Sequence, residues 1–315
     1  MINRKLVILT FCVFLVEIIF YKFLKKVQFN NDNNEFAFAS KKNKHTANND
    51  ENCINRLYYN RVPKCGSSTL VHLMQTLSKL NGFNHFHSHI YDRRLLNYSE
   101  QKEVVKNVTQ QALRSSFDRH VFYINFEDFN ATKSPIYINL IRDPVERIIS
   151  SFYYRRAMAM RRMKKFANIT KPSDYWLRKN FDRCVKVNDT ECTFITGMSY
   201  PTLLVPYFCG QHVNCTLLNN PWALSTALNN INKNYKVIGV LEHFEITLSV
   251  FEKELNFYFR GTKKLYYNLS KVYKNRNIKK ERVSEQTKNI LKINLTAEYT
   301  LYKFVVQKLF KAFKL

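Results

Sequence analysis

Hydrophobic and polar positions alternate differently in successive parts of this chain. Residues 6–24 (LVILTFCVFLVEIIFYKFL) form a nearly continuous apolar run of about the length that crosses a bilayer. Residues 25–52 are polar, rich in Asn and without apolar periodicity, as in an extended tether. From residue 53 onward, apolar residues recur at the spacings typical of strands and helices. We therefore expect a cytoplasmic tail at 1–5, a transmembrane signal anchor at 6–24, a stalk at 25–52 and one folded domain at 53–315.

A cleaved signal peptide is the alternative to the anchor. The sequence Ala37-Phe38-Ala39 resembles a cleavage site, but it lies well past the apolar run. Lys and Arg flank the run on both sides, so the positive-inside rule does not decide its orientation.

The spacing within the folded part predicts strand, loop and helix units. Residues 56–60 form a short strand, and a helix follows in which apolar residues recur at helical spacing: Leu70, Val71, Leu73, Met74, Leu77 and Leu80. Residues 136–141 form a buried strand, and a helix follows from Val145 towards Met160. Further strands are expected at 120–126 and at 236–241, the latter before a helix that reaches about Leu255. This succession predicts an α/β fold with a parallel sheet.

Composition and charge bound the class of protein. Hydrophobic residues make up 45% of the chain and aromatic residues 15%, enough for a sizeable core. Fifty Lys and Arg against 24 Asp and Glu give a formal charge of +26. This excess predicts a polyanionic partner: nucleic acid, anionic lipid or sulfated polysaccharide.

Glycosylation sequons and cysteines both indicate a secretory compartment. Of seven Cys, Cys184 with Cys192 and Cys209 with Cys215 form two close pairs that could each close a small loop. Zinc is the alternative for these four residues, although their spacing is not a C-x2-C repeat. Eight Asn-x-Ser/Thr sequons are candidate glycosylation sites: Asn97, Asn107, Asn130, Asn168, Asn188, Asn214, Asn268 and Asn294.

The segment from Tyr58 to Thr69 (YYNRVPKCGSST) should end a strand and open a helix. Gly66 lets the backbone approach a ligand, the helix N-terminus presents amides, and Lys64 adds charge. Three hydroxyl donors follow: Ser67, Ser68 and Thr69. These features indicate phosphate binding. The Lys precedes the Gly, so the segment is not a Walker A motif, which disfavours a nucleoside triphosphatase. An ordinary capped helix is the alternative.

A second anion subsite is predicted at residues 141–151 (IRDPVERIISS). The motif stands at the carboxyl end of a strand, where ligands bind in open α/β sheets. Arg142 offers a fork for a phosphate, and Ser150 can share that anion if the loop folds back.

These motifs together resemble the Golgi uronyl 2-O-sulfotransferases, the family of heparan sulfate 2-O-sulfotransferase and dermatan/chondroitin uronyl 2-sulfotransferase. The resemblance spans roughly residue 57 to the C-terminus. It is carried by YNRVPK (59–64), RHVFYINF (119–126), YINLIRDPVERIIS (137–150), PYFCGQHVNC (206–215) and VIGVLE (237–242). Residues 64–67 and 207–212 look more like the dermatan/chondroitin branch, and YNRVPK looks more like the heparan branch.

The resemblance implies a P-loop-like sulfotransferase fold and the donor PAPS, with no metal. The first loop, with Lys64, Gly66, Ser67, Ser68 and Thr69, is implied to hold the 5'-phosphosulfate. Arg142 and Ser150 are implied to hold the 3'-phosphate. His120 is implied as the base that takes the proton of the uronic acid 2-hydroxyl, and Lys64 as the group that steadies the leaving phosphate oxygen.

The resemblance also implies partners and a location. The protein is expected to act on a glycosaminoglycan chain, as a single-pass type II Golgi membrane protein with a lumenal catalytic domain, and to form a homotrimer. Arg61 is expected to meet the carboxylate or sulfates of the substrate, and the basic residues of 155–165 to line a polyanion groove. Both close Cys pairs match the family's disulfides. Asp118 stands where the heparan enzyme has a second His, which leaves any auxiliary role at this position open.

Other interpretations remain. His85, His87 and His89 alternate and on a strand would share one face, as metal ligands do, although the stretch is short. A non-catalytic glycosaminoglycan-binding relative would keep the basic surface without a working donor site. A nucleotide kinase lacks its Walker A loop here. A nucleic-acid binder conflicts with the anchor and the sequons, so no nucleic-acid partner is expected.

Overall fold

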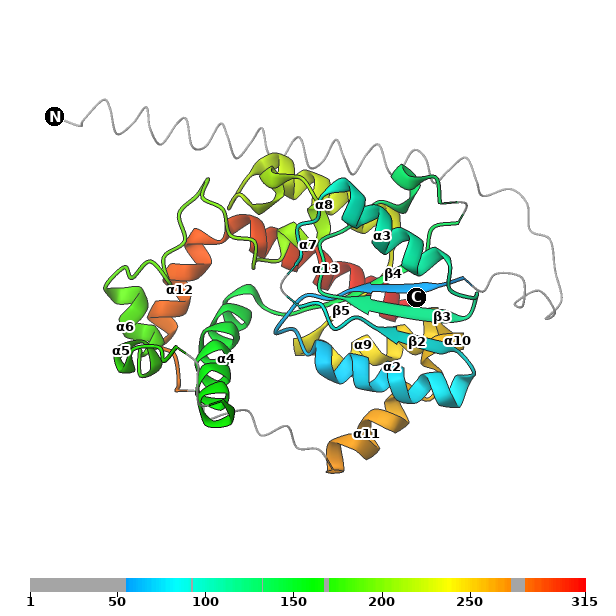
Figure 1. Cartoon of the computed structure of the whole chain (residues 1–315), viewed down its shortest axis with the longest axis horizontal. Helices are drawn as coiled ribbons and strands as arrows, with labels where there is room; N and C mark the ends of the chain where they lie inside the picture. Colours follow the sequence, from blue (N-terminus) through cyan, green and yellow to red (C-terminus); the bar gives the residue numbers. More distant parts are fainter. Residues whose placement is uncertain (1–54, 92, 132, 167–169, 273–280) are drawn as a thin grey trace. The chain divides into compact units, whose positions relative to one another are not determined.

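Five parallel strands form the centre of the folded domain, which we describe from a computed structural model (Figure 1). The structure describes residues 55–315 except 92, 132, 167–169 and 273–280. The strands are β1 (Leu57–Asn60), β2 (Asn84–His87), β3 (Ser115–Arg119), β4 (Ile136–Ile141) and β5 (Tyr235–Val240), in the order β2-β3-β1-β4-β5. Every pair is parallel. The predicted α/β class with a central parallel sheet is thereby confirmed.

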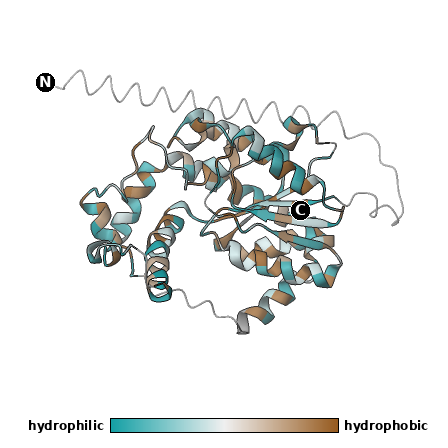
Figure 2. Cartoon of the chain, in the orientation of Figure 1, coloured by the Kyte–Doolittle hydropathy of each residue, from teal (hydrophilic) through white to brown (hydrophobic). Residues whose placement is uncertain are grey.

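Helices cover both faces of the sheet. Figure 1 shows α2 (Ser67–Asn81), α9 (Phe244–Glu254), α10 (Asn256–Phe259) and α11 (Thr262–Val272) on one side, and α3 (Tyr98–Thr109), α7 (Val205–Cys209) and α8 (Pro221–Asn234) on the other. The long α13 (Thr296–Lys314) packs against the edge strand β5 and against α8 and α9. Hydrophobic residues lie on the inward faces of these helices, as the hydropathy colouring shows (Figure 2).

A second group of helices lies beside the sheet. It contains α4 (Pro144–Lys165), α5 (Asp174–Leu177), α6 (Phe181–Lys186) and α12 (Glu285–Asn294), around a smaller core that includes Phe152, Phe181 and Leu291. Three short 3-10 helices complete the described elements: η2 (Phe126–Phe129), η3 (Val213–Thr216) and η4 (Leu241–His243). The apolar periodicity near residue 145 predicted the start of α4 but not the cluster that it organises.

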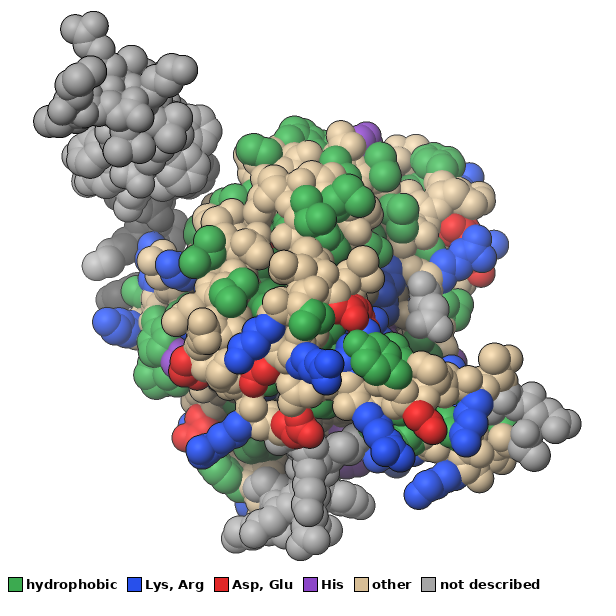
Figure 3. Space-filling model, turned by 90° about the vertical axis from the view of Figure 1, so that its left-hand side faces the viewer, with side chains coloured by type: hydrophobic (Ala, Val, Ile, Leu, Met, Phe, Trp, Pro, Cys, Tyr) green, Lys and Arg blue, Asp and Glu red, His purple; other side chains and the backbone are tan. Residues whose placement is uncertain are grey.

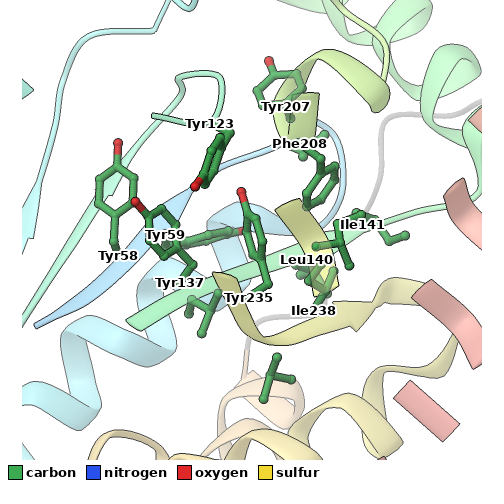
Figure 4. Packing of buried hydrophobic residues seen from close by; sticks show 14 of the residues in the cluster. Tyr58, Tyr59, Tyr123, Tyr137, Leu140, Ile141, Tyr207, Phe208, Tyr235 and Ile238 are labelled. Carbon is green, nitrogen blue, oxygen red and sulfur yellow. The ribbon is translucent and has the colours of Figure 1, made fainter. Parts of the chain in front are cut away.

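The main core is unusually aromatic around β1, β4 and β5. Tyr58, Tyr123, Tyr137 and Tyr235 pack ring against ring there (Figure 4). Rigid aromatic pairs add to the stability from buried area.

Buried amides beside this core tie separate elements together. Asn139 of β4 donates to the Asn60 carbonyl of β1 at 2.7 Å. The Tyr235 hydroxyl of β5 donates to Asn60 Oδ1 at 2.8 Å, and Asn60 in turn donates to the Tyr207 carbonyl of α7. A satisfied network of this kind fixes the relative positions of its elements.

The strand predicted at 120–126 is wrong, because the strand precedes it at Ser115–Arg119. The partners of β3 explain the shift: β1 ends at Asn60, opposite Arg119, and β2 ends at His87, opposite Asp118. Within the part of the chain that the structure describes, no strand continues the ladder beyond these residues. The apolar residues that follow are still buried, and the amide of Phe122 donates to the Arg94 carbonyl instead.

Two smaller differences concern the N-terminus and α2. Leu80, counted in the predicted apolar face of α2, is exposed. Among the described residues no helix is both long and apolar enough to cross a membrane. The predicted anchor (6–24) and stalk (25–52) lie outside the described residues.

Candidate active site

The loop from β1 to α2 is shaped by two residues with left-handed backbone. Lys64 has φ 68° and Gly66 has φ 80°. The left-handed backbone favours glycine at position 66, and a Cβ added there would lie 2.7 Å from Leu241 Cδ1, so the end of that side chain would have to shift. This tight turn brings the chain from the carboxyl end of β1 directly into the first turn of α2.

The N-terminus of α2 is suited to an anion. Its N-cap is Gly66, which has no side chain to accept the first amides, and the Gly66 carbonyl accepts from the amides of Thr69 and Leu70. The earlier amides, of Ser67 and Ser68, have no acceptor within the helix and carry its positive dipole end. Ser67 is buried and Ser68 is exposed, so this end of the helix borders solvent. Phosphate binding by this loop stays a prediction, which an open helix N-terminus permits.

Lys64 extends from this loop towards α4. Its Nζ lies 3.5 Å from the centroid of the Tyr154 ring, a cation–π contact. Tyr154 was not predicted as a site residue, because a ring three turns into a helix forms no motif with a loop 90 residues earlier.

Arg142 stands at the end of β4 between two carboxylates. Its Nη2 lies 3.3 Å from Glu146 Oε2, and its Nε lies 3.7 Å from Glu242 Oε1. Nε is buried and has no hydrogen-bond partner, which leaves a donor for another acceptor. Ser150 lies nearly two turns into α4 and is buried. Arg142 thus lies in the connection from β4 to α4, and Ser150 lies within α4 itself.

Glu242 was not singled out from the sequence. It accepts from the Asp143 amide at 3.1 Å and from the Tyr302 hydroxyl at 3.2 Å. These bonds fasten the end of β5 to the start of α4 and to α13. Glu242 thus holds the loop that carries Arg142.

His120 follows β3 directly and is 7% exposed. Its Nδ1 lies 2.9 Å from the Arg61 carbonyl, which can only accept, so Nδ1 carries the proton and Nε2 the lone pair. The pKa of His120 is lowered to about 4, chiefly by burial and then by the positive charges of Arg61 and Arg94. The Arg61 carbonyl and Asp118 raise the pKa by less than these causes lower it. The imidazole is neutral near pH 7, the state required of a proton acceptor.

Arg61 does not face an open groove. It is 4% exposed, and its Nη1 lies 2.7 Å from Asp118 Oδ1. The predicted contact between Arg61 and a polysaccharide therefore finds no support in this geometry. Arg61 acts instead as the charge partner of a buried carboxylate.

His85 and His87 lie on strand β2, as their alternation predicted, and both rings contact the carboxylate of Asp118 on β3. These three residues carry atoms spaced as metal ligands are. The guanidinium of Arg61 already lies against the same carboxylate, so its charge is offset without an ion. We treat the group as a charge cluster and assign no metal to it.

Two disulfides join the predicted cysteine pairs, Cys184–Cys192 and Cys209–Cys215. The first braces the loop after α6, and the second joins α7 to η3. Cys65 is a buried thiol beside Gly66, and burial raises its pKa to about 12, so it stays protonated and unreactive. Cys53 lies outside the described residues.

The sequons fall mostly on the surface. Asn97, Asn107, Asn130, Asn188, Asn214 and Asn268 are exposed, and Asn294 is half-buried. Asn168 lies outside the described residues. Glycosylation at these positions stays a prediction that surface exposure permits.

The basic stretch of α4 divides into two parts. Arg156 is buried and forms a bidentate pair with Glu191 at 3.2 and 2.8 Å, so its predicted place in a polyanion groove is wrong. Arg161, Arg162, Lys164 and Lys165 are exposed. Figure 3 shows the side of the molecule that lies at the left in Figure 1, with Lys and Arg side chains across its lower half and Asp and Glu side chains among them.

Comparison with known proteins agrees with the geometry. A family model described as the sulfotransferase family matches residues 45–305. The chain is 36% identical over 274 residues to the uronyl 2-sulfotransferase homolog pip of Drosophila melanogaster, covering 82% of this chain and 52% of that protein. It is 35% identical over 260 residues to human uronyl 2-sulfotransferase, covering 80% and 62%.

A more distant relative has a different acceptor in its name. Human heparan sulfate 2-O-sulfotransferase 1 is 30% identical over 239 residues, covering 73% of this chain and 63% of that protein. The chain thus spans roughly half to three-fifths of the length of these curated relatives.

Proposed function

The chain belongs to the sulfotransferase family, and from that premise we propose that it transfers a sulfuryl group from PAPS to the 2-hydroxyl of a uronic acid in a glycosaminoglycan. The observation that carries the proposal is the pairing of an open helix N-terminus at α2 with a neutral, oriented His120 at the carboxyl edge of one sheet. The names of the relatives supply the acceptor class.

The described residues fit the donor PAPS. The amides at the start of α2 and the hydroxyls of Ser67, Ser68 and Thr69 suit its 5'-phosphosulfate. The guanidinium of Arg142, whose Nε makes no hydrogen bond, suits the 3'-phosphate, and we assign Ser150 of α4 to the same phosphate. PAPS supplies the sulfuryl group and a good phosphate leaving group.

His120 begins the transfer as general base. Its Nε2 takes the proton of the sugar 2-hydroxyl while that oxygen forms a bond to sulfur. The bond between sulfur and the phosphate oxygen breaks in line. Lys64 donates a hydrogen bond to that oxygen as its negative charge develops, aided by the α2 amides. No metal ion enters this mechanism.

The acceptor and the location follow from the surface and the secretory features. We place a glycosaminoglycan over the exposed basic end of α4, because charge dominates recognition of sulfated chains. The two disulfides and the exposed sequons support a lumenal domain. We propose a type II Golgi membrane protein anchored by residues 6–24, and a homotrimer as the family resemblance implies.

Replacement of His120 by Ala tests the proposed base. We expect sulfate transfer to fall at least about a hundredfold, because a positioned general base contributes that much, while binding of 3'-phosphoadenosine 5'-phosphate persists. Transfer from radiolabelled PAPS and calorimetric titration measure the two quantities. His72→Ala, on the exposed face of α2, is the matched control and should change neither. Near-normal turnover in His120→Ala would remove His120 from the mechanism.

A further inference from the structure

Asp118 is the centre of a buried cluster beside the proposed base. Its carboxylate is fully buried and meets groups from two other segments. Arg61 Nη1 lies 2.7 Å from Oδ1, His87 Nδ1 lies 2.9 Å from Oδ2, and His85 Nε2 lies 3.1 Å from Oδ2. None of these contacts is part of the transfer step described above.

Arg61 links this cluster to His120. Its amide donates to the Arg119 carbonyl at 2.8 Å, and its guanidinium donates to Asp118, so β3 holds it at both ends. The Arg61 carbonyl between these anchors accepts from His120 Nδ1 at 2.9 Å. The imidazole is thus oriented by a carbonyl whose own position depends on a carboxylate.

We propose that Asp118 is a positioning residue for His120. Through the Arg61 guanidinium it fixes the carbonyl that accepts the Nδ1 proton, and it thereby keeps Nε2 as the basic nitrogen. The inference rests on the proposed function, in which His120 is the base. It also assigns a task to Arg61 that agrees with the burial of that residue.

The charges around His120 support this assignment. Arg61 and Arg94 face it as cations and lower its pKa, whereas Asp118 raises that pKa, and the ring of Tyr91 lies 5.6 Å away. Burial alone would raise the pKa of Asp118, but His85, Arg61 and His87 together hold it below its ordinary value. The carboxylate therefore stays ionised and offsets Arg61 beside the base.

Nitrogen NMR on the full-length chain with labelled histidine tests the proposal directly. In the wild type we expect His120 to show a protonated Nδ1 and a bare Nε2. In Asp118→Asn, which keeps the shape and removes the charge, we expect a mixture of both tautomers and about a tenfold loss of kcat/KM, part of the contribution of a positioned base. An unchanged tautomer in a folded Asp118→Asn overturns the proposal.

A second buried carboxyl provides the control. Glu298 is 1% exposed and accepts from the amides of Leu204 and Val205 at the start of α7. Glu298→Gln should lower stability and leave the His120 tautomer unchanged. A tautomer change in this variant as large as in Asp118→Asn would show a general response to core damage and would overturn the assignment.

Arg61→Met gives a test that does not depend on the folding of Asp118→Asn. It removes the cation beside His120 and leaves Asp118 with only its two histidine partners, so the pKa of His120 should rise by about one unit or more. Activity should then fall on the acid side between pH 7 and 5, where the wild type stays flat. Absence of that acid loss contradicts the proposal. Should wild-type transfer itself be absent, the proposed function fails, and the NMR comparison still decides the role of Asp118.

Discussion

At the residue scale, Gly66 shapes the loop predicted to bind phosphate, through its backbone conformation and through the space that it leaves for Leu241. Gly66 has φ 80°, which side chains rarely adopt, and Leu241 fills the space where its Cβ would be. Gly82 at the other end of α2 has φ 72° with nothing within 4 Å of its Cβ position. Comparison of Gly66 with Gly82 therefore distinguishes the conformational cost of adding a side chain from its steric cost.

Both glycines can be replaced by Ala in this comparison. We expect Gly82→Ala to lower the free energy of unfolding by about 1 to 2 kcal/mol, the cost of the left-handed backbone. Gly66→Ala should cost about 1 kcal/mol more, because Leu241 must move, and should also weaken 3'-phosphoadenosine 5'-phosphate binding. Urea denaturation and calorimetry measure these effects. Equal stabilities of the two variants, with donor binding intact, would contradict the steric account of Gly66.

The lowered pKa of His120 also predicts how stability depends on pH. The unfolded chain, with an ordinary pKa near 6.5, binds more protons than the folded chain between pH 6.5 and about 4. The neutral imidazole of His120 therefore contributes its full stabilisation to the folded state above pH 6.5. This stabilisation, up to about 3 kcal/mol, is lost as the pH falls towards 4. Relative to the wild type, His120→Gln should gain that amount between pH 7 and 4 in denaturant titrations. A difference that does not vary with pH would refute the buried neutral imidazole.

At the element scale, α4 combines a structural half with a half suited to a polyanion. In the structural half, Arg156 stacks on Phe152 and Trp176 while it pairs with Glu191, so the helix is fastened to the segments around the Cys184–Cys192 loop. The exposed cations follow one to two turns later. Helical periodicity does not distinguish Arg156 from these exposed cations. The difference depends on its partner Glu191, which lies 35 residues further along the chain.

Single substitutions along α4 should show this division. Arg156→Ala is expected to lower the free energy of unfolding by about 2 kcal/mol, because it removes the buried packing of Arg156 on Phe152 and Trp176, while Glu191 keeps its ion pairs with Arg155 and Lys179. Arg161→Ala with Arg162→Ala should change stability by less than about 0.5 kcal/mol and reduce retention on a heparin column. Thermal denaturation and salt elution give both values. Wild-type stability of Arg156→Ala would refute the structural role of Arg156.

The sequence predicted the elements whose patterns are local. β1, α2, β4 and α4 follow from runs of a few apolar residues next to a turn, and so do Lys64, Gly66 and Arg142 in their loops. The strand predicted at residues 120–126 was wrong, because a buried apolar segment has the pattern of a strand whether or not a neighbouring strand extends far enough to pair with it. Asp118 gained its importance from pairing across β2 and β3, which no spacing within the chain reveals.

At the scale of the whole molecule, the charge and the sheet edge act together. A formal charge of +26 favours a polyanionic partner, while the loop predicted to bind phosphate and the proposed base, His120, both lie at the carboxyl edge of the sheet. Charge alone agrees equally well with a protein that only binds polysaccharide. Catalysis is the claim that separates the two.

The decisive measurement is therefore sulfate transfer to defined acceptors. The protein would be given radiolabelled PAPS with desulfated heparan, dermatan or chondroitin in separate reactions, and the product disaccharides analysed. We expect label on the 2-position of a uronic acid in at least one acceptor, and the preferred acceptor identifies the branch. Absence of transfer to every acceptor, together with no binding of 3'-phosphoadenosine 5'-phosphate, would refute the proposed catalysis and leave a non-catalytic polysaccharide-binding protein.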